Sequence, residues 1–207
     1  MIELAIETAL HACSAALLDG GRLVADRHEV ISRGHAERLV PLVAELMAES
    51  GLRRADRVIV DVGPGSFTGI RVGIAAARAF GLAWKAPVDG CTSTALAAAG
   101  VFADHPGIDR LYVAFDASRG EVYAQAFDRS GAISGLQALA PEVAAEAARG
   151  MPVAGSGAAL LAAIDPLLAI VGHPWPRARD ARHLAADART GAARPLYVRA
   201  PDAKVPA

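Results

Sequence analysis

The sequence predicts an α/β protein made of two similar halves, each containing a mixed β-sheet flanked by helices. Leu4-Ala5-Ile6-Glu7 resembles Val113-Ala114-Phe115-Asp116, so each half ends its first strand with a carboxylate. Twelve residues after each carboxylate, Leu17-Leu18-Asp19 corresponds to Ala126-Phe127-Asp128. The order of expected elements repeats too, as three strands, a helix, a strand and a helix. We therefore expect two lobes, with the last residues free to pack back on the first lobe; the two lobes are residues 1–103 and 104–207.

The first lobe is expected to begin with three short strands that form a meander. Asp19-Gly20-Gly21 is a strong turn sequence between the second and third of these strands. A helix follows, in which apolar residues recur at helical spacing before Gly51, a good residue for a helix C-terminus. The expected strands are residues 2–8, 11–18, 22–31 and 57–62, and the expected helices are residues 35–50 and 69–85.

The second lobe is expected to repeat this order with shorter elements. Residues 131–139 supply a third strand, and a helix follows from Pro141 to Arg149, with proline in its first turn. Residues 151–154 then lead into the turn Gly155-Ser156-Gly157 and a last helix.

The composition argues against several classes of protein. Lys and Arg number 21 against 22 Asp and Glu, so no overall field attracts a nucleic acid or an anionic membrane. No apolar run approaches the roughly 18 residues of a membrane-spanning helix. Glu3 and Glu7 interrupt the start of the chain, which does not resemble a signal peptide. We expect a cytoplasmic protein with no membrane partner, in which Cys13 and Cys91 are free and buried.

A carboxylate at the end of the first strand in each of two repeated units is the layout of actin-like and sugar-kinase ATPases. The loop after Glu7 reads Thr8-Ala9-Leu10-His11 and contains no glycine, so its amides are poorly placed to wrap a phosphate. The second lobe has more residues suited to contacting a phosphate, because Asp116 and Arg119 lie in one loop and Gly155 and Gly157 precede a helix. The alternatives for these positions are an ordinary β-turn and a tight turn. An active kinase or ATPase of this fold remains the competing function.

The sequence gives little support for a hydrolase active site or for a metal site. Ser66 lies in Gly-Ser-Phe-Thr-Gly, which differs from the Gly-x-Ser-x-Gly nucleophile elbow, and its hydroxyl suits the start of the following helix. None of the six histidines pairs with another at the spacing of a helical metal site. We expect neither a catalytic residue nor a metal site.

The helix at 69–85 carries the most informative pattern. Gly69, Gly73, Ala77 and Gly81 recur every four residues and form a stripe of small side chains, along which another backbone can approach closely. A helix that is apolar nearly all round has neighbours on two sides. The stripe fits either a protein–protein interface or packing against the 35–50 helix of the same chain.

The sequence resembles the TsaB (YeaZ) family of bacterial tRNA threonylcarbamoyladenosine synthesis. The resemblance runs from end to end and is most specific at residues 62–81. The matching segments are LAIETALHACSAAL at the start, SRGHAERLVPLV at 32–43, VGPGSFTGIRVGIAAARAFG at 62–81, FDASRGEVYAQAF at 115–127 and PLYVR at 195–199.

The resemblance implies a duplicated actin-like (ribonuclease H-like, ASKHA) fold and a non-catalytic scaffold subunit. Such a subunit pairs with TsaD, which transfers a threonylcarbamoyl group to N6 of adenosine 37 in tRNAs reading codons that begin with A, and with the ATPase TsaE. The histidine metal motif of TsaD-type proteins is absent here, and Glu7 stands where the family commonly has Asp. The resemblance therefore implies no tightly bound cofactor, with ATP or ADP and Mg²⁺ only at a junction with partners, and tRNA contacted through the complex.

The family's pairing surface carries over onto the helices at 35–50 and 69–85, which could also form a homodimer in the isolated protein. We expect Ala77→Leu to weaken partner binding more than it disturbs the fold. The expected partner-binding residues are His35, Leu39, Leu42, Val43, Leu46, Gly69, Ile70, Gly73, Ile74, Ala77, Phe80 and Gly81.

Overall fold

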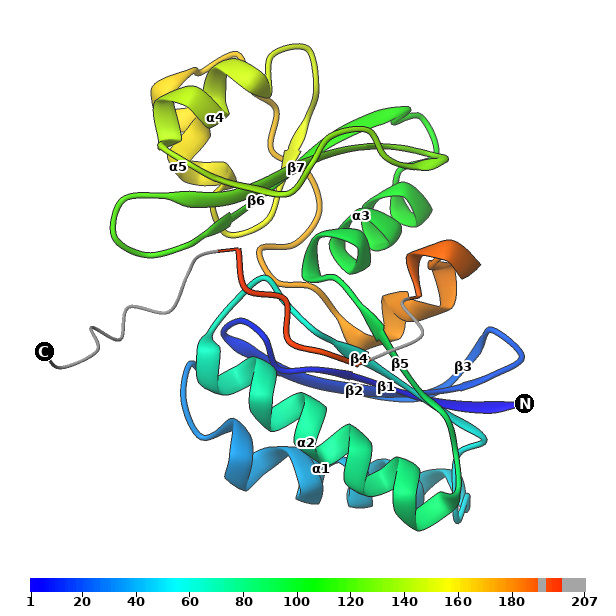
Figure 1. The fold of residues 1–207 in the computed structure, drawn as a ribbon. Coiled ribbons are helices and arrows are strands. Elements are labelled where there is room, and N and C mark those ends of the chain that lie inside the picture. The colour runs from blue at the N-terminus through cyan, green and yellow to red at the C-terminus, as the bar shows by residue number, and fades with distance from the viewer. Residues whose placement is uncertain (190–192, 199–207) are drawn as a thin grey trace, which may run out of the picture.

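Two lobes are stacked one above the other in the computed structural model, which describes residues 1–189 and 193–198 (Figure 1). The first lobe is built on a five-stranded sheet in the order β3-β2-β1-β4-β5. β1 pairs antiparallel with β2 and parallel with β4, so the sheet is mixed. Its strands are β1 (Ile2–Glu7), β2 (Ala12–Asp19), β3 (Arg22–Val30), β4 (Arg57–Asp61) and β5 (Val88–Cys91).

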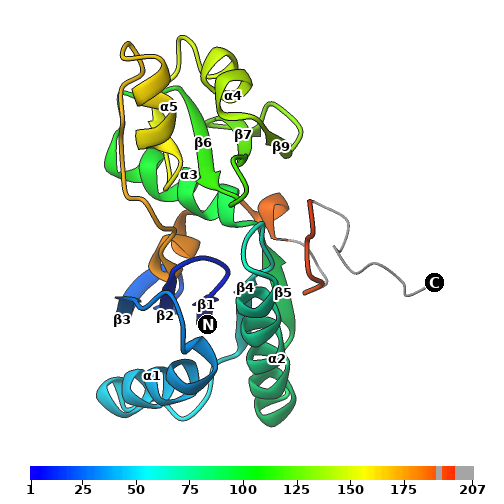
Figure 2. The ribbon, with the colours of Figure 1, turned by 90° about the vertical axis from the view of Figure 1, so that its left-hand side faces the viewer.

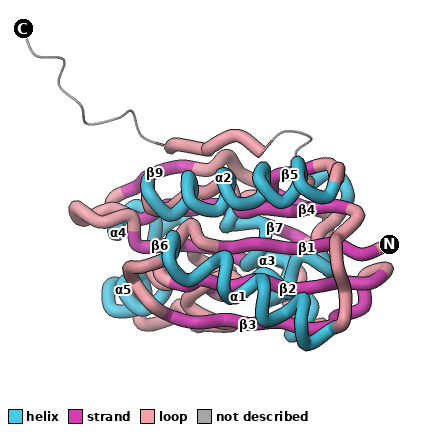
Figure 3. Tube along the Cα trace, turned by 90° about the horizontal axis from the view of Figure 1, so that it is seen from below, coloured by secondary structure: helices cyan, strands magenta, loops and turns pink. Residues whose placement is uncertain are grey.

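Two helices, α1 (His35–Ser50) and α2 (Phe67–Trp84), cover the face of this sheet that points away from the second lobe (Figures 1 and 2). Seen from below, α1 lies over β2 and β3 while α2 lies over β4, and the two helices contact one another (Figure 3). α1 ends at Gly51 in the left-handed conformation, as expected, and Ser66 caps α2 by accepting a hydrogen bond from the Gly69 amide.

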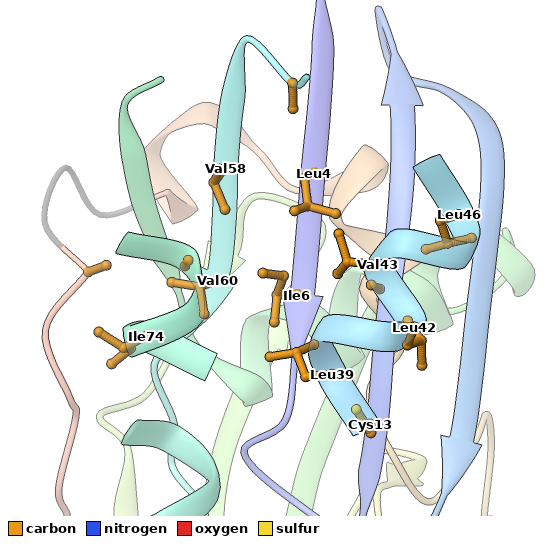
Figure 4. Packing of buried hydrophobic residues seen from close by; sticks show 14 of the residues in the cluster. Leu4, Ile6, Cys13, Leu39, Leu42, Val43, Leu46, Val58, Val60 and Ile74 are labelled. Carbon is orange, nitrogen blue, oxygen red and sulfur yellow. The ribbon is translucent and has the colours of Figure 1, made fainter. Parts of the chain in front are cut away.

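Successive side chains along each strand point to opposite faces of the first sheet. Leu4 and Ile6 of β1 pack under α1 and α2 (Figure 4), whereas Ala5 between them packs on the opposite face. β4 follows the same rule, with Val58 and Val60 facing the two helices. The sheet is therefore covered on both sides.

The second lobe repeats the plan in reduced form. Its sheet has the order β10-β6-β7-β8, and β9 pairs with β7. The expected third strand at 131–139 is two short pieces, since the chain turns away between them. The strands are β6 (Arg110–Asp116), β7 (Val122–Asp128), β8 (Gly131–Ala132), β9 (Gln137–Leu139) and β10 (Val153–Ala154), and the helices are α4 (Pro141–Ala147) and α5 (Ala158–Ile164). The order of elements confirms the duplicated actin-like α/β fold with two mixed-sheet lobes.

One helix and the C-terminal segment lie between the two sheets. Helix α3 (Ser93–Asp104) packs on β6 and β7 of the second lobe and on the short 3-10 helix η1 (Ala178–His183), which lies against β2 of the first (Figure 1). A second 3-10 helix, η2 (Ala186–Ala188), follows η1. The chain then returns to the first lobe, where the Leu196 amide donates to the Val62 carbonyl over 2.8 Å.

Among the described residues, no helix combines the length and the apolar character needed to cross a bilayer.

Candidate functional site

The carboxylate that ends β1 is sealed inside the first lobe. Glu7 has no exposed surface, and its Oε1 accepts a hydrogen bond from the Leu10 amide over 3.3 Å. Asp61 at the end of β4 is equally buried, and its Oδ1 accepts from the Gly63 amide and the Ser93 hydroxyl, each over 2.8 Å. Glu7 Oε2 and Asp61 Oδ2 have no partner within the described residues.

Burial determines the charge state of this pair. Desolvation raises the pKa of Glu7 well above its ordinary value, and the neighbouring Asp61 raises it further. Desolvation also raises the pKa of Asp61, to about 7, against the lowering effect of its two hydrogen bonds. Within the described residues, no three His, Cys, Asp or Glu side chains form a cluster that could hold a metal ion. Glu7 is thus a poor counterpart of a Mg²⁺-organising carboxylate.

The loop after β1 is filled by the chain's own backbone. The Ser66 amide donates to the Ala9 carbonyl over 2.6 Å, and the Thr8 hydroxyl donates to the Gly69 carbonyl over 2.8 Å. A Cβ atom at Gly65 or Gly69 would collide with the carbonyl oxygen of Ala9 or Thr8, respectively. The glycines at 65 and 69 therefore let the loop before α2 close directly on the backbone of the loop after β1.

The corresponding loop of the second lobe is exposed at Asp116 and at residues 118–120. Asp116 is exposed, and its amide donates to the Ser156 hydroxyl over 3.0 Å. The Gly157 amide donates to the Ala114 carbonyl over 2.9 Å, which brings the turn at 155–157 beside the end of β6. Arg119 lies in the same loop with a left-handed backbone (φ 57°). The structure thus places Asp116 beside the turn at 155–157, keeps Arg119 three residues further along the exposed loop, and buries Glu7 and Thr8 of the other lobe.

The stripe of small residues on α2 faces inward. A Cβ at Gly73 would press on the Thr8 hydroxyl, and one at Gly81 would press on the Val88 side chain. Ala77 has no exposed surface. The stripe packs against β4, β5 and the loop after β1, so its placement on an accessible pairing surface is wrong. The reason is that other parts of the same lobe, and not a partner, lie close against the small residues of α2.

The other expected partner-binding side chains also belong to the core. The His35 ring lies 3.0 Å from the Ala12 carbonyl through Nε2, and Phe80 is half-buried and stacks on Trp84. The resemblance placed the pairing surface on these helices, but apolar residues at helical spacing form the face that the lobe itself buries. The buried members are His35, Leu39, Leu42, Val43, Leu46, Gly69, Ile70, Gly73, Ile74, Ala77 and Gly81.

Comparison with known proteins gives three related findings. The family model described as "TsaD: tRNA N6-adenosine threonylcarbamoyltransferase" matches residues 28–166. The tRNA threonylcarbamoyladenosine biosynthesis protein TsaB of Escherichia coli is 37% identical over 128 residues, which are 61% of this chain and 54% of that protein. An uncharacterized protein of Mycobacterium tuberculosis is 36% identical over 208 residues, covering 97% of this chain and 93% of its own length.

The solved structure of YeaZ from Pseudomonas aeruginosa superposes with a TM-score of 0.81 and is 29% identical, covering 95% of this chain and 99% of that one. The chain belongs to the TsaB (YeaZ) family. The resemblance found in the sequence is confirmed. The glycine-rich segment before α2, the most specific part of that resemblance to TsaB, is the segment that closes the loop after β1.

In this TsaB-family chain the outward faces of α1 and α2 carry stripes of small or apolar residues beside exposed charged ones. The stripe on α1 recurs every four positions as Ala36, Val40, Ala44 and Ala48, and the stripe on α2 as Ala75, Ala79 and Ala83; the exposed charged residues are Glu37, Glu45, Glu49, Arg71 and Arg78. Leu82, 84% exposed, projects from the same side of α2 as Ala79 and Ala75. The sequence-based interpretation did not include these two outward stripes, although the four-residue spacing of the alanines is visible in the sequence.

Charged residues on these helices are tied to the chain itself. Arg38 of α1 bonds both Glu29 and Glu45 over 2.6 Å, and Arg78 of α2 donates to the Ala193 carbonyl over 2.7 Å. Arg71 donates to the Tyr197 hydroxyl over 2.9 Å, while its guanidinium lies 3.5 Å above the centre of the Phe67 ring. Only Arg38 among these three arginines is paired with carboxylates, whereas Arg71 and Arg78 are held in place by neutral groups.

Proposed function

We propose that this chain is a non-catalytic subunit in the synthesis of N6-threonylcarbamoyladenosine in tRNA, and that it pairs with a TsaD-type transferase. The names of the TsaB relatives and the family model support the pathway. The observation that carries the non-catalytic role is the closed loop after β1, in which Gly65 and Gly69 pack on Ala9 and Thr8. This close packing supports the proposal, because it leaves the amides of the loop after β1 little room to wrap a phosphate.

The competing function, an active kinase or ATPase of this fold, requires two working phosphate loops around one nucleotide. Glu7 is fully buried and favours its protonated form, so it offers little charge to a magnesium ion. The exposed loop of the second lobe, with Asp116, is only half of such a site. We therefore propose that ATP or ADP with Mg²⁺ is held, if at all, at a junction with a TsaE-type ATPase or with the transferase.

The outward faces of α1 and α2 are the proposed contact with the transferase. Small side chains at four-residue spacing let a partner helix lie close, and Leu82 supplies an apolar anchor. The isolated protein can use the same face to form a homodimer, which the transferase would displace. tRNA is then contacted through the complex, and the assembly acts in the cytoplasm together with its tRNA substrate.

Reconstitution tests this function. The purified chain is mixed with the TsaD and TsaE proteins of one organism, unmodified tRNA, ATP, bicarbonate, threonine and the enzyme that makes the threonylcarbamoyl adenylate. We expect modified adenosine only when the chain is present, and the same yield with Asp116→Ala or Glu7→Gln in place of the wild type if neither carboxylate acts chemically. Full modification without the chain would refute the proposal.

A further inference from the structure

A cavity of about 880 Å³ lies between α3, the turn that joins β7 to β8, and the C-terminal segment. α3 and the C-terminal segment, drawn in red in Figure 1, run between the two sheets, so the cavity lies where the lobes meet. Its volume falls in the range of about 300–1,000 Å³ that is typical of small-molecule sites. Glu7, Asp116 and Gly155 do not line it, so the cavity is separate from the two loops described above.

One wall of the cavity is a face of α3 made of small side chains. Ala95, Ala98 and Ala99 line it, and Phe102 follows one turn later on the same face. Leu96 of the same helix is buried in the core and does not line the cavity. Because three alanines extend only to Cβ, this face leaves room for a flat group to lie against the helix.

The other walls are apolar and are fixed by contacts outside the cavity. Phe127 of β7 is 4% exposed, and Leu184, directly after η1, is 8% exposed. Tyr197 of the C-terminal segment also lines the cavity, and its ring stacks on Phe67 with 5.4 Å between the ring centres. Arg71 donates to the Tyr197 hydroxyl over 2.9 Å. The cavity is therefore largely formed before any ligand enters.

Polar side chains of the β7 wall are engaged with the chain itself. Gln125 lines the cavity, and its Oε1 accepts a hydrogen bond from the Thr94 hydroxyl over 2.7 Å. Arg129 donates to the His105 carbonyl over 3.2 Å and lies 3.4 Å from Asp109. A ligand would therefore meet mainly apolar contacts on this side.

One negative charge remains on the rim of the cavity. Asp128 and Arg129 carry opposite charges, and partial burial and Arg182 lower the pKa of His183, which keeps its ring neutral near pH 7. Asp187 of η2 is exposed and makes no hydrogen bond or ion pair with the other described residues. A free carboxylate on an apolar cavity attracts a cation and repels an anion.

We propose that this cavity binds a small ring-bearing molecule that is uncharged or carries one positive charge. Its ring lies against the alanine face of α3, and Phe102 and Phe127 add aromatic contacts. A positively charged group on the molecule lies toward Asp187. Phosphorylated molecules are disfavoured by the same carboxylate, so the site differs from the ATP or ADP site proposed at a junction with partners. It stands independently of the proposed function.

Three probes that share one ring test the site on the full chain. Indole is uncharged, tryptamine is a cation and indole-3-acetate is an anion at pH 7. NMR follows the side-chain amide of Gln125 and the backbone amide of Ala99, both in the cavity wall. We expect saturable shifts with indole at a dissociation constant on the order of 1 mM. Tryptamine should bind several-fold more tightly than indole, and indole-3-acetate at least tenfold more weakly than tryptamine.

Variants of the wall locate the binding. Ala99→Leu fills the space and should weaken indole binding at least tenfold, and Ala103→Leu, at an exposed position of the lining, should also weaken it without disturbing the core. Ala163→Leu, at an exposed position of α5, should bind indole like the wild type. Asp187→Asn should leave indole binding unchanged and remove the preference for tryptamine.

Three results would overturn the proposal. The first is the absence of saturable shifts with indole and tryptamine up to about 10 mM, ten times the expected dissociation constant. The second is unchanged indole binding in Ala103→Leu together with unchanged binding in Ala99→Leu. The third is binding of indole-3-acetate as tight as that of tryptamine in the wild type. None of these results bears on the reconstitution of tRNA modification, so the two proposals fail separately.

Discussion

The Thr8 hydroxyl donates a hydrogen bond of 2.8 Å to the carbonyl of Gly69 and so ties the loop after β1 to the first turn of α2. Gly73, one turn further along α2, lies over the same Thr8 side chain. The loop after β1 is thus held by packing within the first lobe, and the exposed residues of α1 and α2 lie on the side of these helices that faces away from the sheet.

Ala77→Leu should destabilise the isolated chain, since Ala77 has no exposed surface and the leucine must displace packed neighbours. Overpacking of this kind costs about 1–3 kcal/mol. This result would reverse the expectation drawn from the sequence, that the fold would suffer less than partner binding. Urea unfolding of the purified variant measures the change, and Ala75→Leu, on the exposed face of the same helix, should leave the free energy of unfolding within about 0.5 kcal/mol of wild type.

Asp61→Asn should change how stability depends on pH. The pKa of Asp61 rises from its ordinary 3.8 to about 7 on folding. Between these two pH values, the folded state keeps a proton that the unfolded chain releases. The stabilising effect of that proton is complete below the unfolded pKa and is lost as the pH rises toward the folded value. The uncharged asparagine avoids this loss and keeps an oxygen for Gly63 and Ser93.

Between pH 4.5 and 7.5, the variant should therefore gain stability relative to wild type by at least about 1.4 kcal/mol, the equivalent of one pKa unit. Urea unfolding at several pH values gives this difference directly. A constant difference across the range would mean that Asp61 ionises with the same pKa in both states.

Arg189→Met should loosen the attachment of the C-terminal segment to the first lobe. Arg189 Nη1 lies 2.7 Å from Glu3 Oε1, and Glu3 is 4% exposed, with Arg57 as its other basic neighbour at 3.9 Å. Removing one member of a largely buried pair leaves a charge poorly compensated, at a cost of about 1–3 kcal/mol. Thermal unfolding should show a lower Tm, whereas Arg194→Met, at an exposed arginine nearby, should unfold like the wild type.

Isothermal titration of the isolated chain with ATP and Mg²⁺ should give no complex tighter than about 1 mM, because backbone fills the loop after Glu7. Adding the transferase and the ATPase can create a site that the chain alone lacks. A 1:1 complex with a dissociation constant on the order of 1 μM, about −8.2 kcal/mol, would instead favour the kinase alternative.

The duplicated plan could be predicted from the sequence because the carboxylate-ended strands repeat with the same offset at Glu7 and Asp116. The helices predicted at 35–50 and 69–85 from periodicity and turn residues lie at 35–50 and 67–84 in the structure. The course of the chain after α5 could not be predicted, since it is held by scattered contacts such as Ala178 on Ser14 and not by a periodic pattern.

The orientation of α2 was the main error in the candidate site. Two small stripes run along this helix, one through Gly69, Gly73 and Gly81 and one through Ala75 and Ala79, and spacing alone does not tell which faces inward. The glycines do carry a physical clue. Glycine costs about 1 kcal/mol relative to alanine inside a helix, so repeated glycines indicate that backbone must approach there. The alanine stripe is the one that faces outward.

The affinity of the chain for its cognate TsaD, with Leu82→Glu compared with Leu167→Glu, tests the central claim most directly. The two leucines are matched in exposure, at 84% and 93%, but Leu82 lies on α2 and Leu167 lies in the second lobe after α5. Leu82→Glu should weaken the complex at least tenfold, equivalent to about 1.4 kcal/mol, while Leu167→Glu should bind like the wild type. Unchanged affinity in Leu82→Glu together with a loss in Leu167→Glu would contradict the account and place the partner on the second lobe.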